Sequence, residues 1–173
     1  NGGGIYSKYS KLIINNVIIS NNTSLGSGGG GGIYISENDT VKITNSTISY
    51  NKSDHDSGEG GGIMIHSKSD VWITGSEISY NNSGRAGGVY VGSGSNLYCK
   101  KTTISDNTVA LNGSAISVIS SNSVELVNTT IANNKGENDV GGWGDWGAAI
   151  YFEVSGVSVK NGIFYNNDPS NWH

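Results

Sequence analysis

Two segments of the chain gather side chains that could carry chemistry. The first, residues 140–147, places Trp143 and Trp146 among glycines on either side of Asp145. Indole rings on a surface loop can stack on sugars, and a carboxylate beside them accepts hydrogen bonds from sugar hydroxyls. The segment therefore predicts a glycan-binding site. The alternative is that both tryptophans fold down and pack on the neighbouring backbone.

The second segment, residues 52–60, is acidic. It holds Asp54, Asp56 and Glu59 together with one histidine. Carboxylates closely spaced before a glycine can bind calcium, although the spacing differs from that of the twelve-residue calcium loop. A calcium site at these three acids is one prediction, and a solvated acidic loop is the alternative. We expect no other cofactor.

An enzyme would need such acids to act together with other groups. Polysaccharide lyases need an arginine or lysine base beside clustered acids, and glycoside hydrolases need carboxylates about 5 to 9.5 Å apart. The one arginine, Arg85, lies in a separate short segment. We therefore expect no catalytic residue. If the chain were a lyase or hydrolase, the candidates would be Asp54, Asp56, Glu59 and Arg85.

These segments separate the copies of a repeat. Six copies of one pattern end at Asn22, Asn51, Asn81, Asn107, Asn134 and Asn167, which lie 29, 30, 26, 27 and 33 residues apart. A period in this range predicts a solenoid. The six asparagines are expected to form a structural ladder, in which stacked amides hydrogen-bond from coil to coil and cap a turn.

Within each copy, apolar residues recur at every second position in short runs rich in β-branched side chains. This is the periodicity of strands rather than of helices. Three such runs per copy predict an all-β solenoid of about six coils with three short parallel sheets. Its core would be five inward columns, which begin at Ile5, Ser7, Leu12, Ile14 and Ile19. Residues 1–167 form this single domain, and 168–173 remain as a C-terminal tail.

The outward columns carry aromatic residues. On the first strand the outward residues are Tyr6, Tyr34, Met64, Tyr90, Ser117 and Tyr151, and on the second they are Ile13, Lys42, Trp72, Tyr98, Glu125 and Ser158. An aromatic stripe of this kind can bind a glycan chain or another protein, or it can stiffen the sheet by stacking. We take Tyr34 and Tyr90 as further glycan-binding candidates.

The repeat also resembles a known group of proteins. Gly-Gly-Ile-Tyr (31–34), Gly-Gly-Val-Tyr (87–90) and Ile-Ser-Tyr-Asn (48–51 and 78–81) resemble repeats of right-handed parallel β-helix proteins of the pectate-lyase-like class. The pattern is most similar to bacterial polymorphic outer-membrane proteins and autotransporter passenger domains, whose repeats carry Gly-Gly-Ala-Ile and Phe-x-x-Asn. The resemblance implies a right-handed coil. It implies no single function, because this architecture hosts lyases, hydrolases, adhesins and inert stalks.

Composition narrows the functional classes. With 14% charged residues and a net charge of −4, the chain lacks the basic surface that nucleic acid requires, and no run approaches 18 apolar residues, so no membrane span is expected. A surface rich in Asn, Ser, Thr and Gly is typical of secreted solenoids. The glycosylation candidates are Asn38, Asn45, Asn112 and Asn128. We expect an extracellular or cell-surface structural or adhesive module that binds glycans, with a polysaccharide lyase or glycoside hydrolase as the alternative.

The two terminal copies lack a capping helix within residues 1–173. We expect them to expose apolar cross-sections, through Ile5, Leu12 and Ile19 at one end and through Ile150, Val157 and Phe164 at the other. The expected partner is a second copy stacked head to tail or the remainder of a longer β-helix, because such end-to-end contacts repeat without closing.

Overall fold

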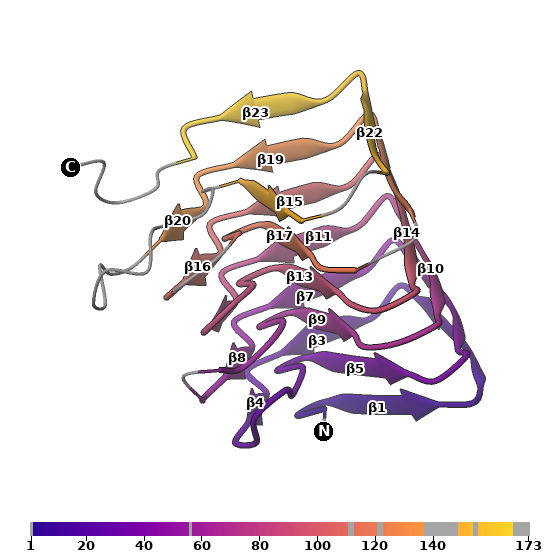
Figure 1. Cartoon of the computed structure of the whole chain (residues 1–173). Coiled ribbons are helices and arrows are strands. Elements are labelled where there is room, and N and C mark those ends of the chain that lie inside the picture. Colours follow the sequence, from indigo (N-terminus) through magenta and orange to yellow (C-terminus); the bar gives the residue numbers. More distant parts are fainter. Residues whose placement is uncertain are drawn as a thin grey trace.

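The computed structural model describes residues 2–55, 57–110, 113–120, 123–136, 149–153 and 156–167. In these residues the regular elements are all strands, which wind as a coil from β1 to β23 (Figure 1). Neighbouring strands pair in parallel throughout. The predicted fold class, an all-β parallel solenoid, is therefore confirmed. No helix in this part of the chain is long and apolar enough to span a membrane.

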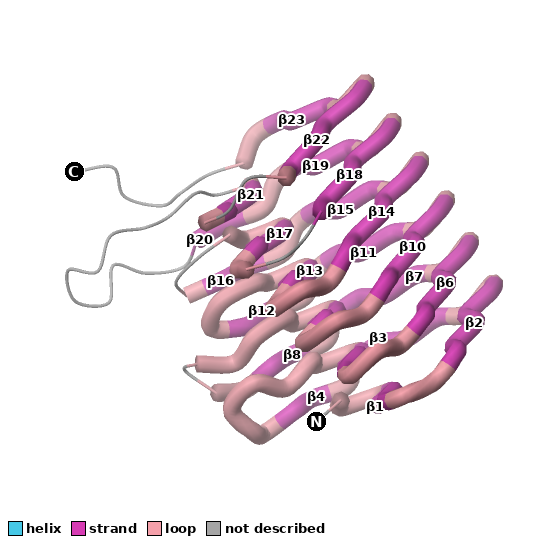
Figure 2. The backbone as a smooth tube through the Cα atoms, turned by 45° about the vertical axis from the view of Figure 1, so that its right-hand side comes forward, coloured by secondary structure: helices cyan, strands magenta, loops and turns pink. Residues whose placement is uncertain are grey.

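Three sheets contain six strands each, and the strands of each lie side by side along the solenoid axis (Figure 2). The first sheet consists of β1 (Ile5–Lys8), β5 (Ile33–Ser36), β9 (Ile63–Ile65), β13 (Val89–Val91), β17 (Ile116–Val118) and β21 (Ile150–Phe152). The second consists of β2 (Lys11–Asn15), β6 (Thr40–Thr44), β10 (Asp70–Thr74), β14 (Asn96–Lys100), β18 (Ser123–Val127) and β22 (Val157–Lys160). The third consists of β3 (Ile18–Ser20), β7 (Thr47–Ser49), β11 (Glu77–Ser79), β15 (Thr103–Ser105), β19 (Thr130–Ala132) and β23 (Ile163–Tyr165).

A fourth sheet of five strands lies directly after the asparagine ladder, in the segments that separate the copies of the repeat. It consists of β4 (Thr23–Ser24), β8 (Lys52–Ser53), β12 (Asn82–Ser83), β16 (Thr108–Val109) and β20 (Lys135–Gly136). Each strand is two residues long, so it contains no repeat of the alternation that reveals a strand in a sequence. The prediction of three sheets is thus extended by a fourth.

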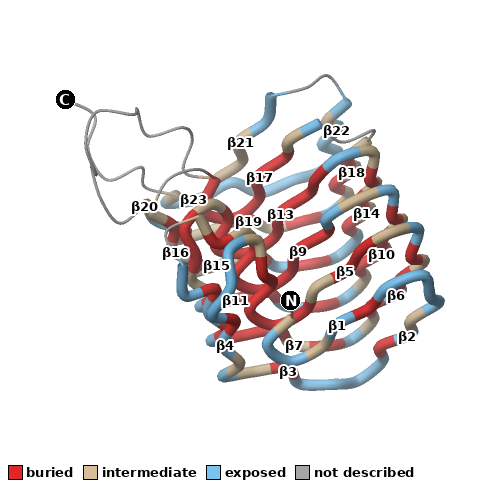
Figure 3. The backbone as a smooth tube through the Cα atoms, turned by 60° about the horizontal axis from the view of Figure 1, so that its bottom comes forward, coloured by how far each residue is buried: buried red, intermediate tan, exposed pale blue. Residues whose placement is uncertain are grey.

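The core follows the five inward columns. Strand pairing keeps each column in register; for example, Ile33 pairs with Ile63, and Ile63 pairs with Val89. Inward side chains of the middle coils are fully buried, and Figure 3 shows buried segments concentrated between the two ends. A single coil could not cover these residues, so the coils above and below each one stabilise it.

The asparagine ladder is a continuous hydrogen-bonded column. In its middle, the backbone N–H and the Nδ2 of Asn81 both donate to Oδ1 of Asn107 at 3.0 Å, while Nδ2 of Asn81 also donates to the Ile48 carbonyl at 2.9 Å. The same geometry recurs from Asn107 to Asn134, with distances of 3.1 and 3.0 Å. The side chains of Asn51, Asn81, Asn107 and Asn134 are at most 1% exposed. Each amide therefore satisfies turn backbone groups that water cannot reach.

Hydroxyl groups perform a similar task at the other two corners. Ser46 and Ser76 accept hydrogen bonds from the backbone N–H groups of Val17 and Ser46 in the coil below, at 3.1 and 3.2 Å. At the corner between the first and second sheets, Asp39 occupies the equivalent position and accepts from the N–H of Ser10 at 2.5 Å. The second carboxylate oxygen of Asp39 is buried without a hydrogen-bond partner.

Close approach of the chain explains the Gly-Gly motif. A Cβ on Gly61 would lie 2.5 Å from the Asn82 carbonyl oxygen and 2.6 Å from that of Gly87. Both atoms belong to the backbone of the next coil and cannot turn aside. Glycine is therefore required where the chain enters the first sheet.

The two ends differ. At the C-terminal end Phe152, Val159 and Phe164 are 57%, 43% and 48% exposed, whereas Ile14 and Ile19 at the N-terminal end are 4% and 5% exposed. The second coil covers the inward side chains of the first, but no described coil lies above the last one. The expectation that Ile19 would be exposed is thus wrong, whereas Ile5 and Leu12 are partly buried and Phe164 is exposed.

Candidate functional site

An aromatic pair lies on the outer face of the second sheet. Trp72 on β10 stacks on Tyr98 on β14, with ring centroids 5.2 Å apart and planes 13° from parallel. The two residues are cross-strand partners, so the sheet itself brings their rings together. Because one face of each ring is turned toward the other, only the outer faces of the pair remain available to a ligand.

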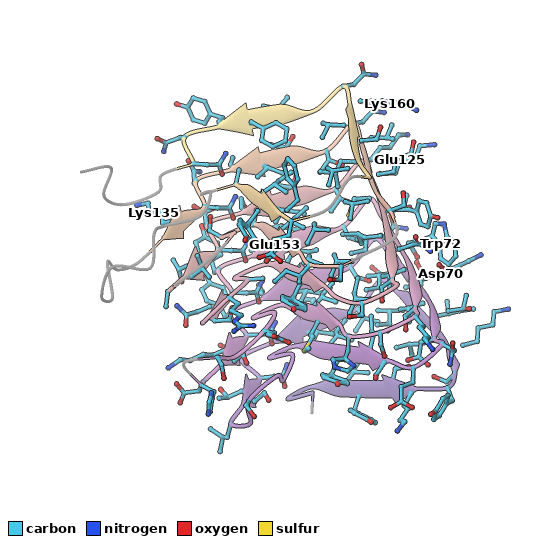
Figure 4. All side chains as sticks on the ribbon, in the orientation of Figure 1. Asp70, Trp72, Glu125, Lys135, Glu153 and Lys160 are labelled. Carbon is cyan, nitrogen blue, oxygen red and sulfur yellow. The ribbon has the colours of Figure 1, made fainter. Side chains whose placement is uncertain are left out.

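Charged residues lie at both ends of this pair. The Lys42 ammonium lies 6.0 Å from the Trp72 ring centroid, over the outer face of the indole. On the other side, Glu125 on β18 is the strand partner of Tyr98 and forms an ion pair with Lys160 at 3.4 Å. Figure 4 shows Trp72, Glu125 and Lys160 one above another on the same side of the solenoid. The face of Tyr98 that points toward Glu125 is therefore the open one.

A groove of about 310 Å³ lies at this open face. It is lined by Trp72, Thr74, Tyr98, Cys99, Lys100, Glu125 and Val127. The Cys99 side chain points into the core, so the polar side chains of the groove are those of Thr74, Lys100 and Glu125. Within the described residues Lys100 forms no ion pair. The groove thus combines an aromatic surface with the Lys100 ammonium and with the Glu125 carboxylate, which also pairs with Lys160.

The two predicted tyrosines on the first sheet lack such an open face. Tyr90 is 7% exposed and packs with Met64 and Ala86 beneath the segment that precedes β13. This burial raises the pKa of Tyr90 to about 12. The ring of Tyr34 is half-buried between Tyr6, 5.3 Å away, and His66, 5.9 Å away. We therefore withdraw Tyr90 as a glycan contact, and Tyr34 offers only its ring edge.

The acidic candidates are divided between separate ion pairs. Asp54 pairs with Lys52 at 2.6 Å, and Glu59 pairs with Arg85 at 3.1 Å. In the described part of the chain, no three His, Cys, Asp or Glu residues lie close enough to hold a metal ion. Asp56, the third predicted ligand, lies outside the described residues, so the calcium site stays a prediction.

Several predicted residues lie outside the described residues, namely Trp143, Asp145, Trp146, Asp56 and Asn112, as does the tail 168–173. Three glycosylation candidates are described, and Asn38, Asn45 and Asn128 are all exposed at corners with positive φ. Their exposure is what attachment of a glycan requires. Asn51 and Asn81, which also begin Asn-x-Ser sequences, are buried in the ladder.

The sequence signal for the groove lies in the outward column of the second strand. Trp72 and Tyr98 stand next to each other in an outward column, flanked by Lys42 and Glu125. The tyrosine stripe of the first sheet gave an equally strong pattern. Only the folded structure distinguishes them, because the segments between coils cover the first sheet at Tyr90 and leave the second sheet open at Tyr98.

Comparison with known proteins defines the family. The family described as right handed beta helix region matches residues 3–171, which is nearly the whole chain. No curated protein and no solved structure matches the chain. The match agrees with the parallel coil and its stacked sheets. The chain therefore belongs to the right-handed β-helix family.

Proposed function

We propose that this protein is an extracellular structural or adhesive module that binds a glycan in the groove beside Tyr98. The open face of the Tyr98 ring, set beside Lys100 and Glu125, is the observation that carries this proposal. A sugar presents an apolar C–H face that packs on an aromatic ring and hydroxyls that need donors and acceptors at its edge. The groove provides both, and its volume lies at the lower end of the range for ligand sites, roughly 300 to 1,000 Å³.

The rigid backbone around the groove also favours binding. Tyr98, Lys100 and Glu125 project from neighbouring strands whose positions are set by parallel pairing. A ligand would therefore not have to order a mobile loop, which lowers the entropic cost of binding. The extracellular setting is supported by the exposed Asn38, Asn45 and Asn128 sequons and by the resemblance of the repeat to bacterial surface proteins.

We do not extend the proposal to a lyase or hydrolase activity. Asp54, Glu59 and Arg85, the described candidates for acid and base, are engaged in ion pairs. The Arg85 guanidinium is held against Glu59 at 3.1 Å and is not directed at a substrate. Release of unsaturated or reducing-end products from acidic polysaccharides would show that an enzyme is present after all.

A glycan array tests the binding proposal. We expect Tyr98→Ala to lose at least about tenfold in affinity for the glycans that the unchanged protein binds. Packing of the sugar ring on an aromatic side chain contributes much of the binding energy in such sites. Tyr80→Ala is the matched control, because Tyr80 also stacks on an aromatic ring, that of Tyr50 at 4.9 Å, but lies outside the groove. Melting temperatures would verify that both variants are folded.

Two results would contradict the assignment. Equal binding by Tyr98→Ala and the unchanged protein would exclude the groove. Loss of binding only in Trp143→Ala with Trp146→Ala would transfer the site to the segment 140–147, where our prediction of a glycan contact stands.

A further inference from the structure

Two stacked tyrosines lie at the corner between the third and fourth sheets, outside the groove beside Tyr98. Tyr50 follows β7 and Tyr80 follows β11, and their ring centroids lie 4.9 Å apart with the planes 4° from parallel. Each ring covers one face of the other, yet the two residues remain 57% and 49% exposed. Both belong to middle coils, with a paired coil on either side. Their exposure is therefore independent of the two ends of the solenoid.

The backbone at this corner favours other residue types. The equivalent positions of the other four coils hold Asn21, Asp106, Asn133 and Asn166. All six residues of the column have φ between 49° and 57°. Asparagine and aspartate tolerate this left-handed conformation, whereas a bulky aromatic residue in it is uncommon. The turn itself does not call for tyrosine, and the two tyrosines consequently indicate a function for their exposed rings.

The outer face of the Tyr80 ring is turned toward the coil that holds Asp106. The register that pairs Ser79 with Ser105 makes Asp106 the counterpart of Tyr80 in that coil. Because aspartate has a shorter side chain than tyrosine, the place that a third ring would occupy lies open beside a carboxylate. The charge of Asp106 is close enough to raise the pKa of Tyr80.

Negative charge lies around this open face. Glu77 on β11 is exposed, and its Oε1 accepts a hydrogen bond from Oγ of Ser79 at 2.7 Å. Within the described residues, neither Glu77 nor Asp106 forms an ion pair. Lys52, which follows the ladder one coil earlier, is paired with Asp54 at 2.6 Å. The corner thus combines an aromatic face with carboxylates that the described lysines do not neutralise.

The same chain shows what binds to such an arrangement. At the corner after β1, Tyr9 also has a left-handed backbone, with a φ of 54°. Glu37 is its counterpart in the next coil, because the register pairs the residues that precede them. Nζ of Lys8 lies 5.0 Å from the Tyr9 ring centroid and 3.0 Å from Oε1 of Glu37. A corner tyrosine with a carboxylate in the next coil therefore holds an ammonium between the ring and the carboxylate.

The corner of Tyr80 has the ring and the carboxylate of this arrangement but not its lysine. Lys8 is the last residue of β1, whereas the last residue of β11 is Ser79, whose side chain is buried. A serine cannot place a positive charge over the neighbouring ring. An ammonium at this corner would therefore come from another molecule.

We propose that this corner binds a lysine side chain of a basic partner protein, whose ammonium lies over the outer face of Tyr80 and against the Asp106 carboxylate. Glu77 adds negative charge at the edge of the site, and the net charge of −4 favours the approach of a basic partner. A single ammonium at an exposed site binds weakly, so the occupant is a protein with further contacts rather than a small cation. The site is separate from the glycan groove, and neither proposal depends on the other.

A titration followed by nuclear magnetic resonance tests the site. The probe is the peptide acetyl-Gly-Lys-Gly-Lys-Gly-amide, and the matched control peptide carries norleucine in place of both lysines. We expect the lysine peptide to shift the ring signals of Tyr80 and the amide signal of Asp106, and the norleucine peptide to shift neither. Tyr80→Asn and Asp106→Asn each insert the residue that this column carries in other coils, so the left-handed turn is kept. Each should lower the affinity for the lysine peptide at least about threefold.

Two control variants separate this site from overall charge and from the glycan groove. Asp70→Asn removes one negative charge from the second sheet, on another side of the solenoid (Figure 4), and should bind the lysine peptide like the unchanged protein. Tyr98→Ala should also bind it normally, whatever its effect on glycans. Melting temperatures would verify that every variant is folded.

Several results would overturn the proposal. Equal affinity of Tyr80→Asn and the unchanged protein would exclude the ring, and equal shifts with the norleucine peptide would exclude recognition of the ammonium. A loss in Asp70→Asn as large as that in Asp106→Asn would reduce the effect to overall charge. Shifts confined to the groove beside Tyr98, or no shifts with the lysine peptide, would remove this corner as a binding site.

Discussion

Replacing Asn107 by alanine removes four hydrogen bonds from the centre of the ladder. Oδ1 of Asn107 accepts from the N–H and Nδ2 of Asn81, and its own Nδ2 donates to the Ile78 carbonyl and to Oδ1 of Asn134, all at 3.0 Å. Asn107 is 0% exposed, so water cannot replace these partners. The substitution should therefore be strongly destabilising.

The size of the effect depends on which groups lose their last partner. Nδ2 of Asn81 keeps the Ile48 carbonyl, and Oδ1 of Asn134 keeps the backbone N–H of residue 107. The N–H of Asn81 and the carbonyl of Ile78 lose the partner described above, and each buried group left unpaired costs about 1–3 kcal/mol. For the two groups together we expect the free energy of unfolding to fall by about 2–6 kcal/mol.

Chemical denaturation of Asn107→Ala beside Asn82→Ala measures this loss against a neighbouring asparagine. Asn82 is half-buried at the surface, where its Nδ2 donates to Oγ1 of Thr108 at 2.7 Å, and its loss should cost about 0.5 kcal/mol. Equal losses in the two variants would refute the reasoning, because they would mean that burial in the ladder does not increase the contribution of an asparagine side chain to the free energy of unfolding.

Two further predictions concern buried groups. Asp39→Ser should raise the free energy of unfolding, measured by chemical denaturation, by about 1–3 kcal/mol, because it removes the buried carboxylate oxygen that lacks a hydrogen-bond partner. The serine would provide the same hydroxyl that Ser69 and Ser95 provide at this position in the next coils. An unchanged or lower free energy of unfolding would contradict this prediction. Burial raises the pKa of the Cys99 thiol from 9.0 to about 12, so as the pH rises the thiol ionises in the unfolded chain before it ionises in the folded one. The stability that the buried thiol contributes is therefore complete below pH 9 and is lost as the pH rises toward 12. Between these values the unchanged protein should lose about 1.4 kcal/mol per pH unit more than Cys99→Val, and parallel pH curves would contradict the assignment.

The core could be predicted from the sequence because the solenoid repeats one environment. Ile33, Ile63 and Val89 occupy the same place in successive coils, so the column is visible without knowing the angle of any turn. The fourth sheet was missed for the opposite reason. A strand such as Lys52–Ser53 has one inward residue, and that residue is a serine, so neither alternation nor hydropathy marks it.

The candidate site required the structure, because exposure of an outward residue depends on the path of the segments between coils. Tyr90 and Tyr98 are both outward tyrosines on strands that follow each other in the chain, and their sequence surroundings do not separate them. Ala86 packs against the cluster that holds Tyr90, whereas a groove opens at Tyr98. Segments of variable length carry no periodicity from which their path could be predicted.

Residues whose type differs from the other members of their column are therefore the positions of a solenoid that say most about its stability and contacts. Neighbouring coils impose nearly the same surroundings on each member of a column, so one residue type should suit all of them, as asparagine does in the ladder. A residue that breaks the pattern must be stabilised by something outside the column or must lower stability. Asp39, with an unpaired buried oxygen, fits the second case.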